Sequence, residues 1–114
     1  MGETVSFQHK ELASGQWAKM SLCEQMANIG SEVSRAFNWR KKNRHDLSKE
    51  AVNRALELLD LTVVSMNRYS GLKECLRVRE SLIDYFYGEN EFSSSEALWR
   101  NYFDVFVYAA RKAH

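Results

Sequence analysis

The chain of 114 residues contains no proline and only five glycines. Proline inside a helix removes a backbone hydrogen bond and clashes with the preceding turn, so its absence leaves long helices uninterrupted. The glycines stand mostly where helices are expected to begin or end. Between them, hydrophobic residues recur at helical spacing in four stretches. The sequence therefore predicts an all-α fold of four amphipathic helices.

The sequence also lacks long apolar runs and a large excess of charges of one sign. No run approaches the roughly 20 apolar residues that a membrane-spanning helix needs, so we expect no membrane partner. Residues 1–10 lack the apolar segment of a secretory signal, and we expect a cytoplasmic location. Sixteen basic and 15 acidic side chains give a net charge of +1, which offers no electrostatic reason for general nucleic-acid binding.

Donors for a metal or a cofactor are scarce. Cys23 and Cys75 fall inside expected helices, and we interpret them as buried thiols that act as small hydrophobic side chains. The Glu-x-x-His pairs of di-metal helical bundles are absent. Glu57 and Asp60 resemble half of the magnesium motif of all-helical nucleotide pyrophosphatases, but the companion pair is missing, so we interpret them as part of a solvated helix face. We predict no metal site, no cofactor and no catalytic residue.

The domain organisation is simple. Residues 1–15 are polar, and we expect them to form a partly disordered tail. Residues 16–114 are long enough for a single domain, and the 45% of hydrophobic residues is enough for a core.

The first helix is expected over residues 21–42, with a start nearer Gln16 as the alternative. Ser21 and Glu24 have the spacing of a capping box. Four small residues form an edge beside the hydrophobic stripe, which would let another helix approach closely. The expected stripe is Leu22, Met26, Ile29, Val33 and Phe37, the small edge is Cys23, Ala27, Gly30 and Ser34, and the polar face is Glu24, Gln25, Asn28, Glu32 and Arg35.

The second helix is expected to begin near Asp46 or Ser48, both good N-cap residues, and to end near residue 68. Ala51, Ala55, Leu59, Thr62 and Met66 centre its buried face. The third is expected to begin at residue 70 and to end before Gly88. Arg79 lies within the apolar arc of this helix, where an unpaired charge is costly. We expect it to pair with an acid on a neighbouring helix or across an interface. Alternatively, its side chain extends to the surface, so that the charge stays in water.

The fourth helix is expected over residues 94–111, with Ser93 and Glu96 in the spacing of a second capping box. Apolar residues cover more than half of its circumference, so we expect it to be covered on a second side. Short connections favour antiparallel neighbours. The predicted architecture is therefore an antiparallel up-down-up-down four-helix bundle, in which the first two helices form one hairpin and the last two form the other.

A basic hinge between the first two helices is the first candidate binding site. Five bases follow one another without an acid between them, and a tryptophan lies among them, so the hinge could contact phosphates and stack on a base. Alternatively, the cations complement the helix C-terminus and the tryptophan folds back over the loop. The candidate residues are Arg35, Trp39, Arg40, Lys41, Lys42, Arg44 and His45.

Arg40 and His45 are separated by four residues, which is similar to the Arg-x4–6-His motif of the RNA-cleaving HEPN domains. That resemblance implies an arginine that holds phosphate and a histidine that moves protons. In HEPN domains the motif lies late in the bundle, whereas here it joins the first two helices. A solvated hinge is the alternative interpretation.

Aromatic residues concentrate late in the chain, and four of them on the fourth helix are the second candidate site. Trp99, Tyr102, Phe103 and Phe106 are a possible interface, because aromatic residues are enriched where proteins associate. The alternative is a well-filled core.

Residues 24–36, 54–62 and 102–111 resemble a family of small, uncharacterised prokaryotic proteins, and the resemblance covers most of the chain from Trp17 onward. It implies no activity and carries over no functional residue. In architecture the chain also resembles the four-helix bundles encoded in ribosomal RNA intervening sequences and the accessory protein of diversity-generating retroelements. Those proteins form oligomers, and the accessory protein binds nucleic acid through a basic surface, from which the near-neutral charge of this chain departs.

The sequence thus predicts a non-catalytic helical module that associates with itself, as a dimer or higher homo-oligomer, or with an unknown protein partner. The alternative is a nucleic-acid-associated bundle that uses the basic hinge over residues 35–45, with HEPN-like RNA cleavage as its boldest form.

Overall fold

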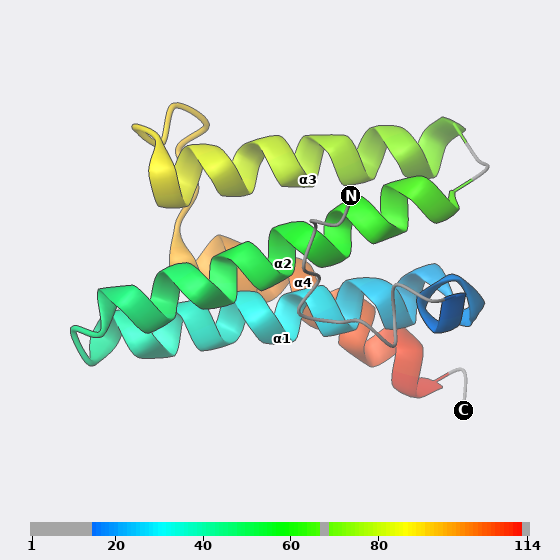
Figure 1. The fold of residues 1–114 in the computed structure, drawn as a ribbon, viewed down its shortest axis with the longest axis horizontal. Helices are drawn as coiled ribbons and strands as arrows, with labels where there is room; N and C mark the ends of the chain where they lie inside the picture. The colour runs from blue at the N-terminus through cyan, green and yellow to red at the C-terminus, as the bar shows by residue number, and fades with distance from the viewer. Residues whose placement is uncertain (1–14, 67–68, 113–114) are drawn as a thin grey trace, which may run out of the picture.

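The computed structural model describes residues 15–66 and 69–112, and these residues form four α-helices and no strand. A short 3-10 helix, η2 (Trp17–Lys19), precedes α1 (Leu22–Lys41), α2 (His45–Ser65), α3 (Tyr69–Tyr87) and α4 (Glu96–Lys112) (Figure 1). The predicted all-α class with four helices is confirmed. The expected tail over residues 1–15 and the expected end of the second helix at residue 68 fall almost entirely outside the described residues.

The beginning of α1 follows the prediction. The N–H of Glu24 donates to the Oγ of Ser21 at 3.1 Å, and the N–H of Ser21 donates to a carboxylate oxygen of Glu24 at 2.9 Å. This reciprocal pair satisfies two backbone donors that a helix start leaves open.

The predicted starts of the second and fourth helices are wrong by a few residues. Arg44 occupies the N-cap position of α2 without a side-chain cap, and Ser48 lies buried inside the helix. The Ser48 hydroxyl donates instead to the carbonyl of Ala36 at 2.9 Å, which fixes α2 onto α1. At α4, the N–H of Leu98 donates to the Oγ of Ser95 at 3.2 Å, so the helix begins at Glu96 and the Ser93 box does not form.

Helix α1 lies against both α2 and α4 (Figure 1). The backbone of α3 packs along α2 alone. The sequence predicted a hairpin of the last two helices, but α3 and α4 do not pack along their lengths. The polar face expected for α1 is also partly wrong, because Gln25 is buried against Trp17 of η2 and Glu32 is buried against Arg54 of α2.

The small-residue edge of α1 is where α4 approaches, as predicted. A Cβ atom on Gly30 would lie 2.6 Å from the Cβ of Phe103. One turn further along α1, the Oγ of Ser34 accepts a hydrogen bond of 2.7 Å from Arg100. The guanidinium of Arg100 also lies 5.5 Å from the centroid of the Phe37 ring, so one arginine holds α4 onto α1 through several contacts.

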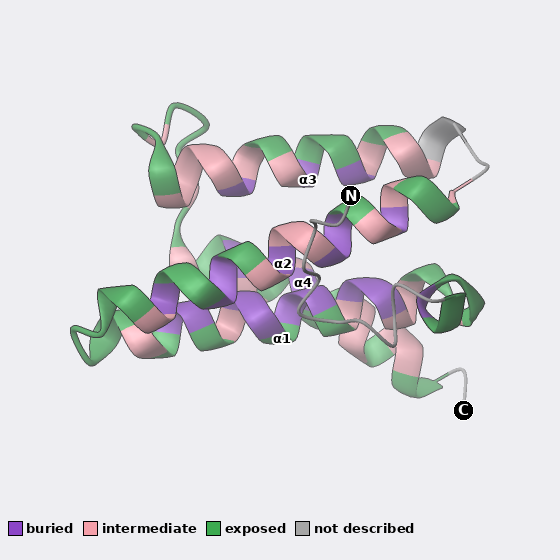
Figure 2. Cartoon of the chain, viewed as in Figure 1, coloured by how far each residue is buried: buried purple, intermediate pink, exposed green. Residues whose placement is uncertain are grey.

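The hydrophobic core gathers residues of all four helices (Figure 2). Trp17 of η2 belongs to it, because its indole N–H donates to the Oγ of Thr62 at 2.8 Å and its carbonyl accepts from Gln25 at 2.8 Å. Cys75 is buried as expected, whereas Cys23 is only half-buried. The members of this cluster are Trp17, Met26, Ile29, Val33, Phe37, Ala55, Leu58, Leu59, Cys75, Val78, Leu82, Trp99 and Phe103.

Candidate functional site

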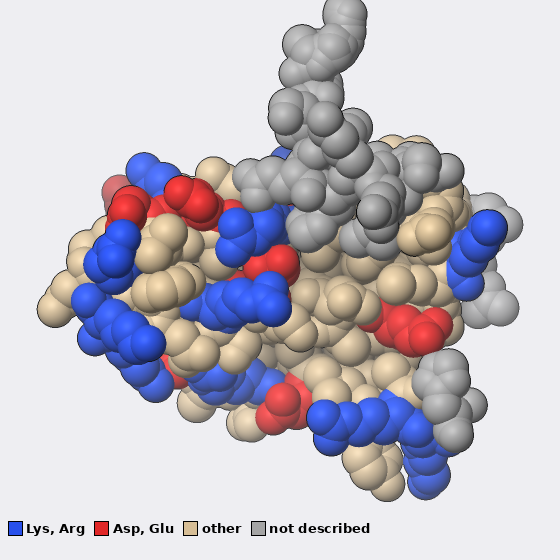
Figure 3. Space-filling view, turned by 60° about the horizontal axis from the view of Figure 1, so that its bottom comes forward, with Lys and Arg blue, Asp and Glu red and all other residues tan. Residues whose placement is uncertain are grey.

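The hinge between α1 and α2 is a tight turn of three residues. Asn43 adopts a left-handed conformation with φ of 59°. The N–H of Arg44 donates to the carbonyl of Trp39 at 2.9 Å, and that of Asn43 donates to Arg40 at 3.0 Å. The turn gathers cationic side chains at one end of the helix pair, where Figure 3 shows lysines and arginines with acidic side chains among them.

Three cations of the predicted basic hinge are paired with carboxylates. No acid lies between the bases in sequence, but Glu32 and Asp46 flank them closely, and Glu96 reaches Lys41 through the fold. The hinge is therefore not a continuous basic surface. The pairs are Arg35 with Glu32 at 3.2 Å, Lys41 with Glu96 at 3.0 Å, and Arg44 with Asp46 at 3.3 Å.

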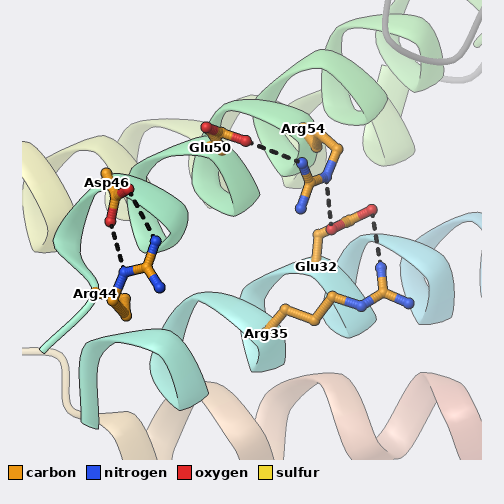
Figure 4. Close-up of polar contacts among 6 residues, drawn as sticks. All are labelled: Glu32, Arg35, Arg44, Asp46, Glu50 and Arg54. Carbon is orange, nitrogen blue, oxygen red and sulfur yellow. Dashed lines mark hydrogen bonds and ion pairs between the residues drawn. The ribbon is translucent and has the colours of Figure 1, made fainter. Parts of the chain in front are cut away.

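Glu32 is the centre of the pairing between α1 and α2 (Figure 4). Its buried carboxylate accepts a hydrogen bond from the Nε of Arg54 on α2 at 3.1 Å, and Arg35 contacts the other oxygen. Arg54 also lies 4.0 Å from Glu50. A buried carboxylate needs such partners, so Arg35 belongs to a structural network as well as to the candidate site.

The ring of Trp39 has cations over it. The Nζ of Lys42 lies 5.4 Å and the Cζ of Arg44 5.9 Å from its centroid. These distances are typical of cation–π contacts. The arrangement agrees with the alternative interpretation, in which Trp39 folds over the loop, and a nucleobase that stacked on this ring would compete with these contacts.

Arg40 and His45 converge on one pocket of about 220 Å³. This pocket lies between the hinge and the C-terminal end of α3. Its other lining residues are Ser48, Lys49, Val52, Phe86 and Tyr87. The sequence singled out Arg40 and His45 but missed Lys49 and Tyr87. Lys49 stands one helical turn after His45, a spacing that could have revealed it, whereas no sequence signal brings Tyr87 of α3 to this place.

Aromatic rings position the cations of this pocket. The guanidinium carbon of Arg40 lies 5.4 Å from the ring centroids of both Tyr85 and Phe86, and the Nζ of Lys49 lies 6.0 Å from that of Tyr87. The Tyr87 hydroxyl donates to the Oδ1 of Asn53 at 2.7 Å, and burial raises the pKa of Tyr87. The phenol therefore stays neutral at physiological pH, and no carboxylate is among the described residues that line the pocket.

The four aromatic residues predicted as an interface form a cluster within the chain. Trp99 and Phe103 are buried with their ring centroids 5.9 Å apart, and Tyr102 lies 5.1 Å from Phe103 and 5.3 Å from Phe106. This arrangement favours the alternative interpretation of a filled core. The large apolar residues of α4 that are exposed are Leu98, Val105 and Tyr108.

A groove of about 270 Å³ lies between α3 and α4. Tyr102 donates a hydrogen bond to Glu74 there, and burial together with that carboxylate raises the pKa of Tyr102 far above its ordinary value. The indole N–H of Trp99, a second lining residue, is buried without a hydrogen-bond partner among the described residues. Buried Val78 and exposed Leu98 and Phe92 add to the apolar part of the lining.

Arg79 has an acid on a neighbouring helix, which was one of the predicted alternatives. Its Nε lies 2.8 Å from an oxygen of Asp60 on α2, and both side chains remain partly exposed. Asp60, half of the motif weighed for magnesium, is therefore an ion-pair partner. Within residues 15–66 and 69–112 no three acidic, histidine or cysteine side chains come together as metal ligands.

Comparison with known proteins gave no match to a protein family, to a curated protein or to a solved structure. The resemblance to small prokaryotic helical proteins stays a prediction. Among the described helices, none combines the length and apolarity that crossing a membrane requires.

Proposed function

We propose that the protein is a non-catalytic, up-down-up-down helical module that associates with a second copy of itself through the outward face of α4. The alternating direction of the colour gradient along successive helices in Figure 1 supports that topology. The resemblance to small prokaryotic helical proteins and a cytoplasmic location are expectations from the sequence that accompany this proposal.

One observation carries the proposal, namely the apolar side chains that α4 leaves exposed. Leu98, Val105 and Tyr108 are 59%, 65% and 66% exposed, although they stand on a helix whose apolar arc is wider than its contact with α1 requires. At 100° per residue the three positions fall within one stripe of the helix. An apolar stripe of this kind is a typical site of association.

A two-fold arrangement makes this stripe self-complementary. In a two-fold dimer the same patch of each copy contacts the other. Val105 stands near the middle of α4 (Glu96–Lys112), so antiparallel α4 helices would place it near the axis. Leu98 and the neighbouring groove would then lie toward the rim of the interface.

The mass in solution tests the proposal. Sedimentation equilibrium of the wild-type chain is expected to give a mass that rises with concentration above the 13.3 kDa of one chain. Val105→Asp is expected to give a monomer with unchanged helical circular dichroism, because the side chain is exposed in the single chain.

Val64→Asp is the matched control, since Val64 is 82% exposed on α2 and lies outside the proposed interface. This variant should associate like the wild type. A wild-type chain that remains monomeric at every concentration, or a Val64→Asp variant that dissociates as much as Val105→Asp, contradicts the proposal.

Association with nucleic acid through the hinge is the second candidate function, with HEPN-like cleavage of RNA as its boldest form. The convergence of Arg40 and His45 on one pocket favours it. The carboxylates paired with Arg35, Lys41 and Arg44 count against a long phosphate-binding track. A gel-shift titration with single-stranded RNA at low salt tests it, and no shift at high micromolar protein removes it.

A further inference from the structure

We propose that the pocket lined by Arg40, His45 and Lys49 binds a terminal phosphate group, that is, a phosphate monoester. The proposal is independent of association through α4. It rests on how the cations of the hinge are held, on where Arg40 and Lys49 converge with the imidazole of His45, and on the size of the space between them.

The cations near the hinge fall into two groups. Arg35, Lys41 and Arg44 are paired with carboxylates, which compensate their charge. Arg40, Lys42 and Lys49 instead lie against aromatic rings, and within the described residues they have no carboxylate partner. Of these three, Arg40 and Lys49 line the pocket, whereas Lys42 lies over Trp39 outside it. A ring face attracts a cation and fixes its position but carries no net charge, so the positive charge remains available to a ligand.

The pocket brings three side chains together from separate elements. Arg40 comes from the last turn of α1, and His45 and Lys49 come from the first two turns of α2. His45 and Lys49 are four residues apart, so they share one face of the helix. The wall opposite is formed by Phe86 and by Tyr87, whose hydroxyl is already bonded to Asn53.

The chemistry of the lining selects a phosphate group. A guanidinium binds two oxygens of a phosphate through parallel hydrogen bonds, and a second and third donor can take the remaining oxygens. A dianion gains more than a monoanion from several cations. The pocket holds about 220 Å³, which is below the usual range for complete drug-sized ligands and suits a phosphate with the atoms next to it.

A terminal phosphate fits better than a chain of phosphates. Lys41 and Arg44, which could continue a track along the hinge, are compensated by acids. Lys42 lies over the ring of Trp39, which Arg44 also contacts. A free mononucleotide and the 5′ end of an RNA strand both present this group, and the experiment separates them.

Isothermal titration calorimetry of the full chain tests the site with four probes: inorganic phosphate, adenosine 5′-monophosphate, and a short single-stranded RNA with a 5′-phosphate or a 5′-hydroxyl. We expect a phosphate-bearing probe to bind at least about tenfold tighter than the hydroxyl RNA. Tight binding of the phosphorylated RNA identifies a strand end as the source, whereas tight binding of only the mononucleotide or phosphate identifies a small molecule.

Variants assign the binding to the pocket. Arg40→Gln and Lys49→Gln should each lower the affinity for the phosphate-bearing probe by about tenfold or more. Lys42→Gln removes a neighbouring cation that lies over Trp39, outside the pocket, and should change affinity by less than about twofold. Because Lys49 is exposed, its variant keeps the test valid if Arg40→Gln fails to fold.

Two results overturn the proposal. The first is equal affinity for phosphorylated and hydroxyl RNA together with no binding of the small probes. The second is an equal loss of affinity in Lys42→Gln and Lys49→Gln. Neither result depends on the mass of the protein in solution, so failure here is distinguishable from failure of association through α4.

Discussion

Gly30 of α1 and Phe103 of α4 meet so closely that a Cβ on Gly30 would lie 2.6 Å from the Cβ of Phe103. We predict that Gly30→Ala destabilises the protein by about 1–3 kcal/mol, because the added methyl forces the helices apart. The loss is expected although alanine favours a helix by about 1 kcal/mol over glycine. Urea denaturation followed by circular dichroism measures it.

Gly71→Ala is the matched control for that prediction. A Cβ on Gly71 would meet only the end of the flexible Met66 side chain, which can turn aside. This variant should be neutral or slightly stabilising. Equal losses at Gly30 and Gly71 would show that the contact with Phe103 does not set the distance between α1 and α4.

Trp17 is fixed in the core by the Oγ of Thr62, which accepts from its indole N–H. Thr62→Val keeps the shape of the side chain but leaves the buried N–H without a partner. We expect a loss of about 1–3 kcal/mol in the free energy of unfolding. Thr62→Ser keeps the acceptor and should lose only about 0.8 kcal/mol for the missing methyl. Similar losses of stability in the two variants would contradict a role for this hydrogen bond in fixing Trp17.

The buried carboxylate of Glu32 makes its two arginines unequal. Arg54 is mostly buried and donates from α2, whereas Arg35 is largely exposed. We predict that Arg54→Gln costs about 1–3 kcal/mol, because a buried carboxylate loses its inner partner. Arg35→Gln should cost less than about 0.5 kcal/mol. Thermal and urea denaturation of the two variants compares them, and a larger loss at Arg35 contradicts the ranking.

Glu96 gives the protein an acid-sensitive contact between α1 and α4. Hydrogen bonds from Arg100 and then Lys41 lower the pKa of Glu96 below its ordinary value of 4.5. A lowered pKa in the folded state means that the unfolded chain binds the proton more readily. The stabilisation is therefore complete above about pH 4.5 and is lost as pH falls through the folded pKa.

Glu96→Gln tests this dependence. The stability difference between wild type and Glu96→Gln should be largest near neutral pH and should shrink below pH 4.5. In a Lys41→Gln background the pH-dependent part of that difference should be smaller, because one of the two cations is gone. A difference that is constant between pH 7 and pH 3 would falsify the assignment.

Local patterns predicted the local structure of this chain. The Ser21–Glu24 box and the stripe from Met26 to Phe37 depend on residues within one helix, so spacing was sufficient to identify them. The stripe was predicted to begin at Leu22, which is wrong, because Leu22 is exposed in the first turn of α1. The burial of Glu32 depends on Arg54, a residue 22 positions away. The periodicity of α1 contains no information about a partner on another helix, so Glu32 was predicted to lie on the polar face.

In the candidate pocket, too, local sequence predicts some of the contacts, whereas others depend on tertiary packing. Arg40 and His45 come together because a tight turn separates them, and their spacing alone could suggest this. The compensation of Lys41 by Glu96 depends on where α4 begins, which tertiary packing decided. The aromatic wall from α3 depends on the placement of a helix some 40 residues downstream, beyond any local pattern.

The position of α3 has a consequence for dynamics. Its backbone packs along one helix, α2, yet its last turn supplies Phe86 and Tyr87 to the proposed phosphate pocket. A helix with one backbone neighbour opens more easily than the central α1, so the amide protons of α3 should exchange before those of α1. A ligand that contacts this wall would slow that exchange by thermodynamic linkage, and α3 would report occupancy of the pocket along its whole length.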